Sequence, residues 1–294
     1  MRRIPLLIAV LAVLAGCGGD SAEPPTIALD FQPNAVHAGI YAAKGVRVRV
    51  PSSSTDSLKL LASGRADVAV VDIHDLGLAR ERGADIVGVG ALVQRPLAAV
   101  IATADIRRPR ELEGKRVGVT GLPSDDAVLR AAVEHDGGDY SKVKRTTIGF
   151  TAVPSQIAGK VDAVVAFWNA EGVALRERGV ATREFRVDEF GAPRYPELVL
   201  AVKEADTADA AHTLAKLAAG TRAALRDRQA TIENLVKVSG ADEELMHAEL
   251  DAVAPALLPP MRLDRAALEG WAKFDARFGI LPRPPDVNEA FPKR

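Results

Sequence analysis

The densest group of side chains able to do chemistry lies between Asp30 and Tyr41, directly after a short apolar run typical of a β-strand. Asn34 is placed to cap a helix that begins there, and the free N–H groups of such a helix end point toward ligands bound at strand ends. His37 and Tyr41 are four residues apart and share one helix face. Taken singly, Asn34 is a cap, His37 a satisfied polar residue and Tyr41 a core residue. Together with Asp30 and Phe31, they predict a recognition surface.

A second group of candidates follows from an internal repeat. Its two copies share a helix end, a glycine, a basic residue, an aspartate and an apolar run, and they span 61–70 and 157–165. Helix–glycine–strand units are common in α/β proteins, so coincidence is the alternative, but the shared order and spacing favour a true repeat. Aligning the copies pairs Asp72 with Phe167 and His74 with Asn169 at the ends of equivalent strands. Ligands bind beyond the carboxyl ends of parallel strands, so we expect Asp72 and the run 167–169 to face one cleft.

The scaffold that positions these groups is predicted to consist of two α/β lobes. The apolar runs of the two repeat copies, which show no alternation, indicate parallel strands covered on both faces. Strands are predicted near 26–29, 46–50, 68–71 and 86–89 in the first lobe and near 116–119, 146–150, 161–166 and 182–187 in the second. The runs 97–102 and 198–202 are predicted to be strands that cross between the lobes. After residue 202 the spacing is helical, and an aromatic stripe around Trp271 is interpreted as core. We therefore expect a first lobe at 26–102, a second lobe at 103–200, and a return to the first lobe with a helical tail at 201–294.

The first residues are predicted to be an export signal. Residues 1–16 combine two arginines with an apolar run too short to span a bilayer, and they end in small residues before Cys17. This resembles the bacterial lipobox, in which the cysteine is lipidated after cleavage; a plain signal with an incidental cysteine is the alternative. Residues 17–25 would then be a lipidated tether. We expect an exported protein, anchored to the outer face of the bacterial cytoplasmic membrane or held in the periplasm.

Composition excludes several classes of function. The 38 Lys and Arg residues and 39 Asp and Glu residues leave a net charge of −1 without a basic stripe, which argues against a nucleic-acid partner. Cys17 is the only cysteine, so the folded part has neither a disulfide nor a thiolate metal site. The sequence shows no metal-spaced His/Cys cluster, no Gly-x-Ser-x-Gly motif and no phosphate-binding glycine loop. We accordingly expect no catalytic residues, no metal and no cofactor.

Five stretches resemble the NMT1/THI5-like solute-binding proteins, and they are 30–41, 92–97, 118–125, 166–172 and 188–196. The resemblance runs from about residue 26 to 202. It implies a type II periplasmic-binding-protein fold, a monomer that binds a small molecule, and the permease and ATPase subunits of an ABC transporter as partners. The best-known branch of the family takes up pyrimidine precursors of thiamine, and other branches bind riboflavin or sulfonates. A fungal branch makes the pyrimidine and carries a cysteine-rich motif, whereas the corresponding 120–124 contains no cysteine.

An aminopyrimidine is a flat, weakly basic ring whose amidine-like edge suits a carboxylate, and its faces suit aromatic side chains. Ser124 follows a turn at a predicted helix start, where N–H groups would hold an anionic or hydroxyl group, or where the residues are simply a helix cap. The candidate ligand-binding residues are Asp30, Phe31, Asn34, His37, Tyr41, Asp72, Gln94, Ser124, Trp168, Asn169, Glu171, Asp188 and Tyr195. A biosynthetic enzyme and the sensor domain of a signalling protein remain the alternatives to a transport receptor.

Overall fold

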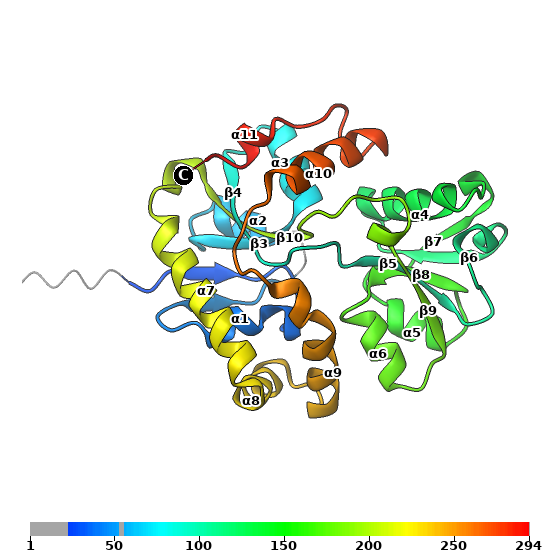
Figure 1. Ribbon diagram of the computed structural model, residues 1–294, viewed down its shortest axis with the longest axis horizontal. Coiled ribbons are helices and arrows are strands. Elements are labelled where there is room, and N and C mark those ends of the chain that lie inside the picture. Colours follow the sequence, from blue (N-terminus) through cyan, green and yellow to red (C-terminus); the bar gives the residue numbers. More distant parts are fainter. Residues whose placement is uncertain (1–22, 53–55, 294) are drawn as a thin grey trace, which may run out of the picture.

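The computed structural model describes residues 23–52 and 56–293 and consists of two α/β lobes that lie side by side (Figure 1). The first lobe holds a five-stranded sheet of order β2-β1-β3-β10-β4, formed by β1 (Thr26–Ala28), β2 (Arg47–Arg49), β3 (Val68–Asp72), β4 (Ile86–Ala91) and β10 (Leu198–Lys203). The second holds a sheet of order β7-β6-β8-β5-β9, formed by β5 (Ala98–Thr103), β6 (Arg116–Val119), β7 (Lys144–Thr147), β8 (Ala163–Phe167) and β9 (Thr182–Arg186). The predicted two-lobed α/β fold is confirmed.

The predicted signal peptide, Cys17 and the part of the tether before residue 23 lie outside the described residues. Among the helices that the structure does describe, none combines the length and the apolar character needed to cross a bilayer.

The internal repeat is a repeat of topology. In each sheet three neighbouring strands run parallel and the next strand is antiparallel, with β10 holding in the first sheet the place that β5 holds in the second. The glycines of the two copies also agree. Gly64 and Gly159, after α2 (Asp56–Ala62) and α5 (Ala152–Ile157), have φ angles of 68° and 63°. This left-handed conformation past a helix end favours glycine because a Cβ would be strained there.

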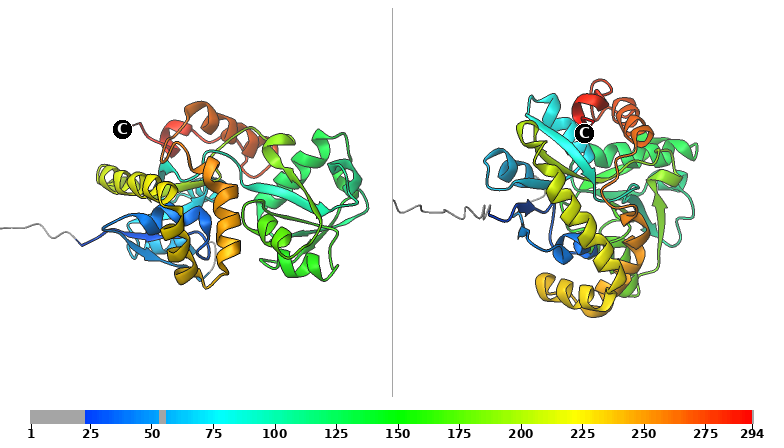
Figure 2. Two further views of the ribbon diagram at one scale, coloured as in Figure 1. Left: turned by 60° about the horizontal axis from the view of Figure 1, so that its bottom comes forward. Right: turned by 60° about the vertical axis from the view of Figure 1, so that its left-hand side comes forward.

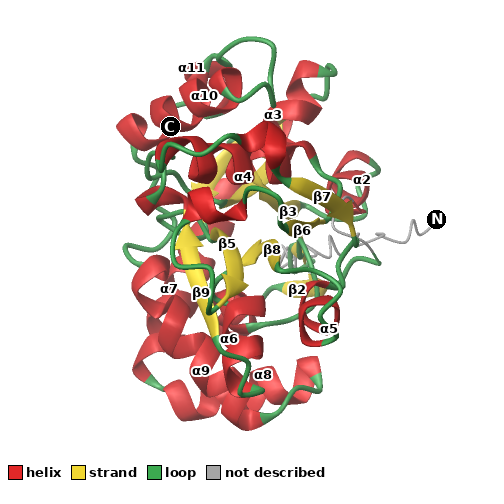
Figure 3. Cartoon of the chain, turned by 90° about the vertical axis from the view of Figure 1, so that its right-hand side faces the viewer, coloured by secondary structure: helices red, strands yellow, loops and turns green. Residues whose placement is uncertain are grey.

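Helices cover both sheets, which explains why the inner strands are apolar at nearly every position (Figure 3). β4 is buried throughout, as are the first four residues of β3. The helices between the strands are α1 (Ala38–Ala42), α3 (Ile73–Glu81), α4 (Pro123–His135) and α6 (Glu171–Glu177), together with α2 and α5. A short 3-10 helix, η1 (Ala35–His37), precedes α1.

The chain after β10 is helical and returns to the first lobe (Figure 2). Its helices are α7 (Ala210–Arg226), α8 (Arg228–Ser239), α9 (Glu243–Val253), α10 (Arg265–Arg277) and α11 (Val287–Ala290). α7 and α8 pack on α1, whereas α9 contacts both η1 in the first lobe and α6 in the second. Trp271 of α10 is buried and meets Phe291 edge-on, at 5.7 Å between ring centroids. The interpretation of this aromatic stripe as core is confirmed.

The chain passes between the lobes twice, through 92–97, which joins β4 to β5, and through 187–197, which joins β9 to β10. The prediction that the strands at 97–102 and 198–202 themselves cross is wrong. β5 pairs only with β8 and β9, inside the second sheet, and β10 pairs only with β3 and β4, inside the first. The second lobe therefore begins before β5 rather than after residue 102. An apolar run identifies a buried strand without saying which of two sheets it joins.

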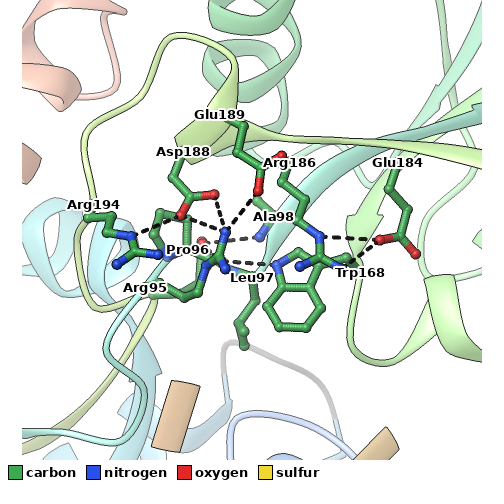
Figure 4. A network of polar contacts seen from close by, with 11 residues as sticks. Arg95, Pro96, Leu97, Ala98, Trp168, Glu184, Arg186, Asp188, Glu189 and Arg194 are labelled. Atoms are coloured by element: carbon green, nitrogen blue, oxygen red, sulfur yellow. Dashed lines mark hydrogen bonds and ion pairs between the residues drawn. The ribbon is translucent and has the colours of Figure 1, made fainter. Parts of the chain in front are cut away.

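Side chains of the crossovers and of the second lobe hold the two crossovers together (Figure 4). Arg95 on the first crossover donates to the Asp188 carboxylate on the second, at 2.9 Å. Trp168, just after β8, donates its indole N–H to the Pro96 carbonyl at 3.0 Å. The face of the same ring meets the Arg186 guanidinium, whose carbon lies 4.1 Å from the ring centroid. The crossovers are thus held to each other and to the second sheet.

A buried polar network around His74 also contacts both crossovers. His74 at the start of α3 contacts Asp275 of α10 through Nδ1 (2.6 Å) and Tyr195 of the second crossover through Nε2 (3.2 Å). Glu197, at the end of that crossover, accepts the backbone N–H groups of Leu97 (2.9 Å) and Ala98 (3.2 Å), where β5 begins. The network therefore joins the helical tail, the first lobe and both crossovers.

The charges of this network depend on one another. Burial alone would lower the pKa of His74, but the carboxylates of Asp275, Asp72 and Glu197 outweigh it and raise this pKa to about 10. Burial raises the pKa of Asp72 well above its usual range against the opposing charge of His74, and Glu197 raises it further. At neutral pH, His74 is therefore an imidazolium that lies beside the carboxyl groups of Asp275, Asp72 and Glu197.

The raised pKa of His74 predicts that the protein loses stability in alkaline solution. The unfolded chain gives up this proton near pH 6.5, whereas the folded chain keeps it to about pH 10. The free energy of unfolding should therefore fall as pH rises between these values, by at most about 1.4 kcal/mol per pH unit for one proton. His74→Gln should flatten this dependence in urea unfolding curves, whereas His212→Gln, at an exposed position of α7, should keep it. An unchanged slope in His74→Gln would refute the assignment.

Candidate ligand-binding site

A cavity lies between the lobes, and both lobes contribute to its wall. The first lobe supplies side chains that follow β1, end β3 or precede β10. The second supplies the start of β5, the turn before α4, the loop after β7 and the end of β8. Predicted site residues that line the cavity are Asp30, Phe31, Asn34, Asp72, Ser124, Asn169 and Glu171. These groups, far apart in the sequence, meet because the carboxyl ends of the parallel strands of both sheets face the cleft.

Asp30 is held in place by the helix that follows it. Its Oδ1 lies 2.7 Å from His37 Nε2, and the Asn34 backbone N–H donates to His37 Nδ1 at 3.3 Å. Since Nδ1 accepts a hydrogen bond, the ring proton lies on Nε2 and is donated to Asp30. His37 is fully buried and does not line the cavity. It positions a carboxylate rather than meeting a ligand itself.

Among the described residues that line the cavity, Asn169 has a buried polar atom without a hydrogen-bond partner. It follows β8, lines the cavity and is 1 % exposed, and its Oδ1 has no hydrogen-bond partner. The repeat makes the contrast informative, because His74 at the equivalent position of the first lobe is bonded to Asp275. A buried acceptor without a partner costs about 1–3 kcal/mol, so a ligand that donates to Asn169 recovers this free energy on binding.

Two predicted residues line the cavity with their polar groups already engaged. Asn34 caps η1, accepting from the Val36 N–H at 2.9 Å and donating to the Gln32 carbonyl at 3.2 Å. Glu171 accepts the Phe167 N–H at 3.1 Å, and burial raises its pKa. Both therefore shape the wall through local structure.

The turn before α4 is capped by the side chain of Asp125. The N–H groups of Gly121 (2.9 Å) and Leu122 (3.1 Å) both donate to Asp125, whose carboxylate also accepts from the Thr120 hydroxyl. Ser124 lines the cavity beside this turn. Two N–H groups of this turn are thus satisfied by the chain's own carboxylate.

An aromatic pair closes the cleft from both sides. Phe31 of the first lobe and Phe150 of the second have ring centroids 5.4 Å apart with an interplanar angle of 31°. Phe150 is 55 % exposed and lines the cavity. Sequence reasoning had placed it inside a strand, but β7 ends at Thr147 and Gly149 turns the chain with a φ of 57°. Its position just beyond a strand end, like that of Phe31, was the available signal.

Five other predicted residues lie outside the cavity wall. Trp168, Asp188 and Tyr195 belong to the contacts that hold the two crossovers, as described above. Gln94 donates to the Arg262 carbonyl at 3.0 Å, and Tyr41 packs against the core of the first lobe. The stacking role expected for Trp168 and Tyr195 thus has no support from the geometry, because both side chains are buried against the crossovers.

The charge of the cavity wall is one-sided. Its ionisable residues are all acidic, and they are Asp30, Asp72, Asp75, Asp125, Glu171 and Glu197; no Lys, Arg or His is among the described residues that line it. Asp75 and Glu197 were not among the predicted ligand-binding residues. Such a wall suits a ligand that donates hydrogen bonds or carries positive charge, and it opposes an anion.

Within the described residues, the set able to bring three metal-binding atoms within 4.8 Å of one another is Asp72, His74 and Glu197. Both ring nitrogens of His74 are already engaged, by Asp275 and Tyr195. We therefore assign the three residues to the buried polar network around His74.

Comparison with known proteins places this architecture among binding proteins and a few enzymes. The formylaminopyrimidine-binding protein of Halalkalibacterium halodurans is 35% identical over 250 residues, which cover 79% of this chain and 74% of the relative. The 4-amino-5-hydroxymethyl-2-methylpyrimidine phosphate synthase of Uromyces fabae is 30% identical over 152 residues, covering 47% of this chain and 42% of the relative. The alkanesulfonate-binding protein SsuA of Xanthomonas axonopodis pv. citri, solved with bound MOPS, has a TM-score of 0.72 at 19% identity, covering 92% of this chain and 99% of that one.

The SsuA likeness establishes the periplasmic-binding-protein fold, with its two lobes and the cleft between them. A family model described as NMT1/THI5 like matches residues 34–233, which include strands of both sheets and most of the cavity wall. Because this match covers more than half of the chain, the chain belongs to the NMT1/THI5-like family.

Proposed function

We propose that this chain is the solute-binding protein of an ABC importer and that its ligand is an aminopyrimidine of the thiamine-precursor type. The observation that carries the proposal is the cavity wall, which combines acidic side chains, the unpaired Asn169 and two phenylalanine rings. The named function of the Halalkalibacterium halodurans relative supports the same ligand class.

The chemistry of the ring fits this wall. An aminopyrimidine carries an exocyclic amino group, and protonation of the adjacent ring nitrogen turns its edge into a paired donor. A carboxylate accepts both hydrogen bonds of such an edge, and charge-assisted bonds are roughly twice as strong as neutral ones. Asp30, with one oxygen fixed by His37, is the best-positioned acceptor of this kind. The faces of the ring would pack against Phe31 and Phe150.

The residues that line the cavity also bear on the alternative ligands and on the alternative of an enzyme. A sulfonate needs cationic side chains or free N–H groups, yet the described lining residues include no cation, and Asp125 occupies the N–H groups before α4. The enzyme reading has less support from the relatives, because the match to the Uromyces fabae synthase covers 47% of this chain, whereas the match to the Halalkalibacterium halodurans binding protein covers 79%. Riboflavin has a larger ring system, and its titration in the same calorimetric measurement distinguishes it from the aminopyrimidine.

In the proposed transport cycle, the exported protein is anchored through lipid on Cys17 and acts as a monomer. It captures the ligand between its lobes and delivers it to the permease and ATPase subunits. The crossovers 92–97 and 187–197 would act as the hinge, because the sheets on either side are each complete in themselves.

The first prediction of this proposal concerns the polar wall. Asp30→Asn should weaken binding of 4-amino-5-hydroxymethyl-2-methylpyrimidine about tenfold or more in calorimetry, because it removes the charge and keeps the shape. Asp85→Asn, an exposed change in the same lobe, should bind normally. Normal affinity in Asp30→Asn would contradict the assignment.

Asn169→Ala separates a binding role from a structural one. Binding should weaken by about 1–2 kcal/mol because a hydrogen bond to the ligand is lost. The free protein should melt at the same temperature or higher, because an unpaired buried acceptor has been removed. A clearly lower melting temperature together with unchanged affinity would show that Asn169 serves the fold instead.

The aromatic pair gives a further prediction. Phe150→Ala should reduce affinity by about 0.5–1.5 kcal/mol through the loss of an aromatic face. The matched control is Ile157→Ala, at a similarly exposed apolar position of the same lobe outside the cavity. Equal affinities of the two variants would exclude Phe150 from ligand binding.

Membrane anchoring is tested separately from ligand binding. Cys17→Ser should move the protein from the membrane fraction to the soluble fraction and abolish the lipid adduct seen by mass spectrometry. A wild-type protein without lipid on Cys17 would refute this part of the proposal.

A further inference from the structure

Two carboxyl groups from opposite lobes face the same cavity. Asp75 lies on α3 of the first lobe, and Asp125 lies in the first turn of α4 of the second. Within the part of the chain that the structure describes, no hydrogen bond or ion pair engages the Asp75 carboxylate. Asp125 keeps its carboxylate fixed by the turn before α4. The Asp75 carboxylate thus has no bonding partner among the described residues, whereas the Asp125 carboxylate is held in place.

Bringing these two groups together has an electrostatic cost. Burial raises the pKa of Asp75, the opposing charges of His74 and Arg82 lower it, and Asp125 across the cleft raises it again. Burial likewise raises the pKa of Asp125, in spite of the hydrogen bonds that it accepts. Two carboxylates in a partly buried cleft repel each other unless a cation or a proton lies between them.

The cavity wall itself supplies no such cation, because its ionisable lining residues are all acidic. The other features of the wall point in the same direction. Asn169 Oδ1 is an almost fully buried acceptor without a donor, and the rings of Phe31 and Phe150 offer the faces that attract cations. A ligand that brings a positive charge into the cavity would therefore relieve this repulsion and meet donor-free acceptors.

We infer that the cleft selects an aminopyrimidine that carries a protonated amine on its side arm, with the ammonium group held between Asp75 and Asp125 and the ring beside Asp30 and Asn169. This inference rests on the proposed function and narrows it. It excludes phosphorylated forms of the pyrimidine, which would bring a further negative charge into an acidic cavity. It also ranks ligands with neutral arms, whether hydroxymethyl or formylamino, below the amine.

The test uses calorimetry on the purified full chain at neutral pH with 4-amino-2-methylpyrimidines that differ only in the arm at C5. The arms are aminomethyl, hydroxymethyl, formylaminomethyl and hydroxymethyl phosphate. We expect the aminomethyl compound to bind about tenfold more tightly than either neutral compound, and the phosphate to bind least. Tighter or equal binding of a neutral compound would overturn this inference and leave the proposed function intact. Failure of all four compounds to bind would overturn both.

Asp75→Asn identifies the group responsible. It should reduce affinity for the aminomethyl compound about tenfold and leave affinity for the hydroxymethyl compound within about twofold, so that the preference disappears. Asp126→Asn, a neighbour of Asp125 that is exposed and pairs with Arg145, should retain the preference. A uniform loss for both compounds in Asp75→Asn, or a preference that survives it, would overturn the inference. Asp125 is left unchanged because it also holds the turn before α4.

Discussion

The imidazolium of His74 allows three carboxyl groups to lie close together where the two lobes meet. Asp275 holds one side of the ring and Tyr195 the other, while Asp72 and Glu197 lie within its field. Without this positive charge, the buried carboxyl groups would repel one another and lose an ionic partner, and Glu197 would be less well placed to accept the N–H groups that begin β5. The alignment of the crossovers, and with it the shape of the cleft, depends on that charge.

The two lobes use one topology for different purposes. At equivalent strand ends the first lobe carries His74, which the helical tail satisfies through Asp275, and the second carries Asn169, which no described residue satisfies. The tail packs mainly on the first lobe, so the second keeps its polar strand end open. The asymmetry of the cleft follows from where α10 lies, although the sheets themselves are closely similar.

The parts of the structure that depend on local patterns could be predicted from the sequence. Apolar runs located the central strands, and the glycines of the repeat located helix ends. Asp30 was found because it follows a strand directly. The sequence predicts Trp168 and Tyr195 at the ligand, whereas the structure places both in contacts with the crossovers. Aromatic residues near strand ends suit either place equally well by sequence. Asp75 was missed since it lies on a helix, where only the approach of the other lobe turns its face into a cavity wall.

The path of the chain through the two sheets has a consequence for the order in which the protein is completed during synthesis. The second sheet is built from the continuous stretch 98–186, whereas the first sheet needs β10, which lies between β3 and β4. Until residue 203 has left the ribosome, the first lobe lacks an inner strand and exposes the apolar edges that β10 will cover. The second lobe has no such gap and can close earlier. The first lobe is thus completed later, although its N-terminal part leaves the ribosome first. The long-range pairing of β10 with β3 slows its folding.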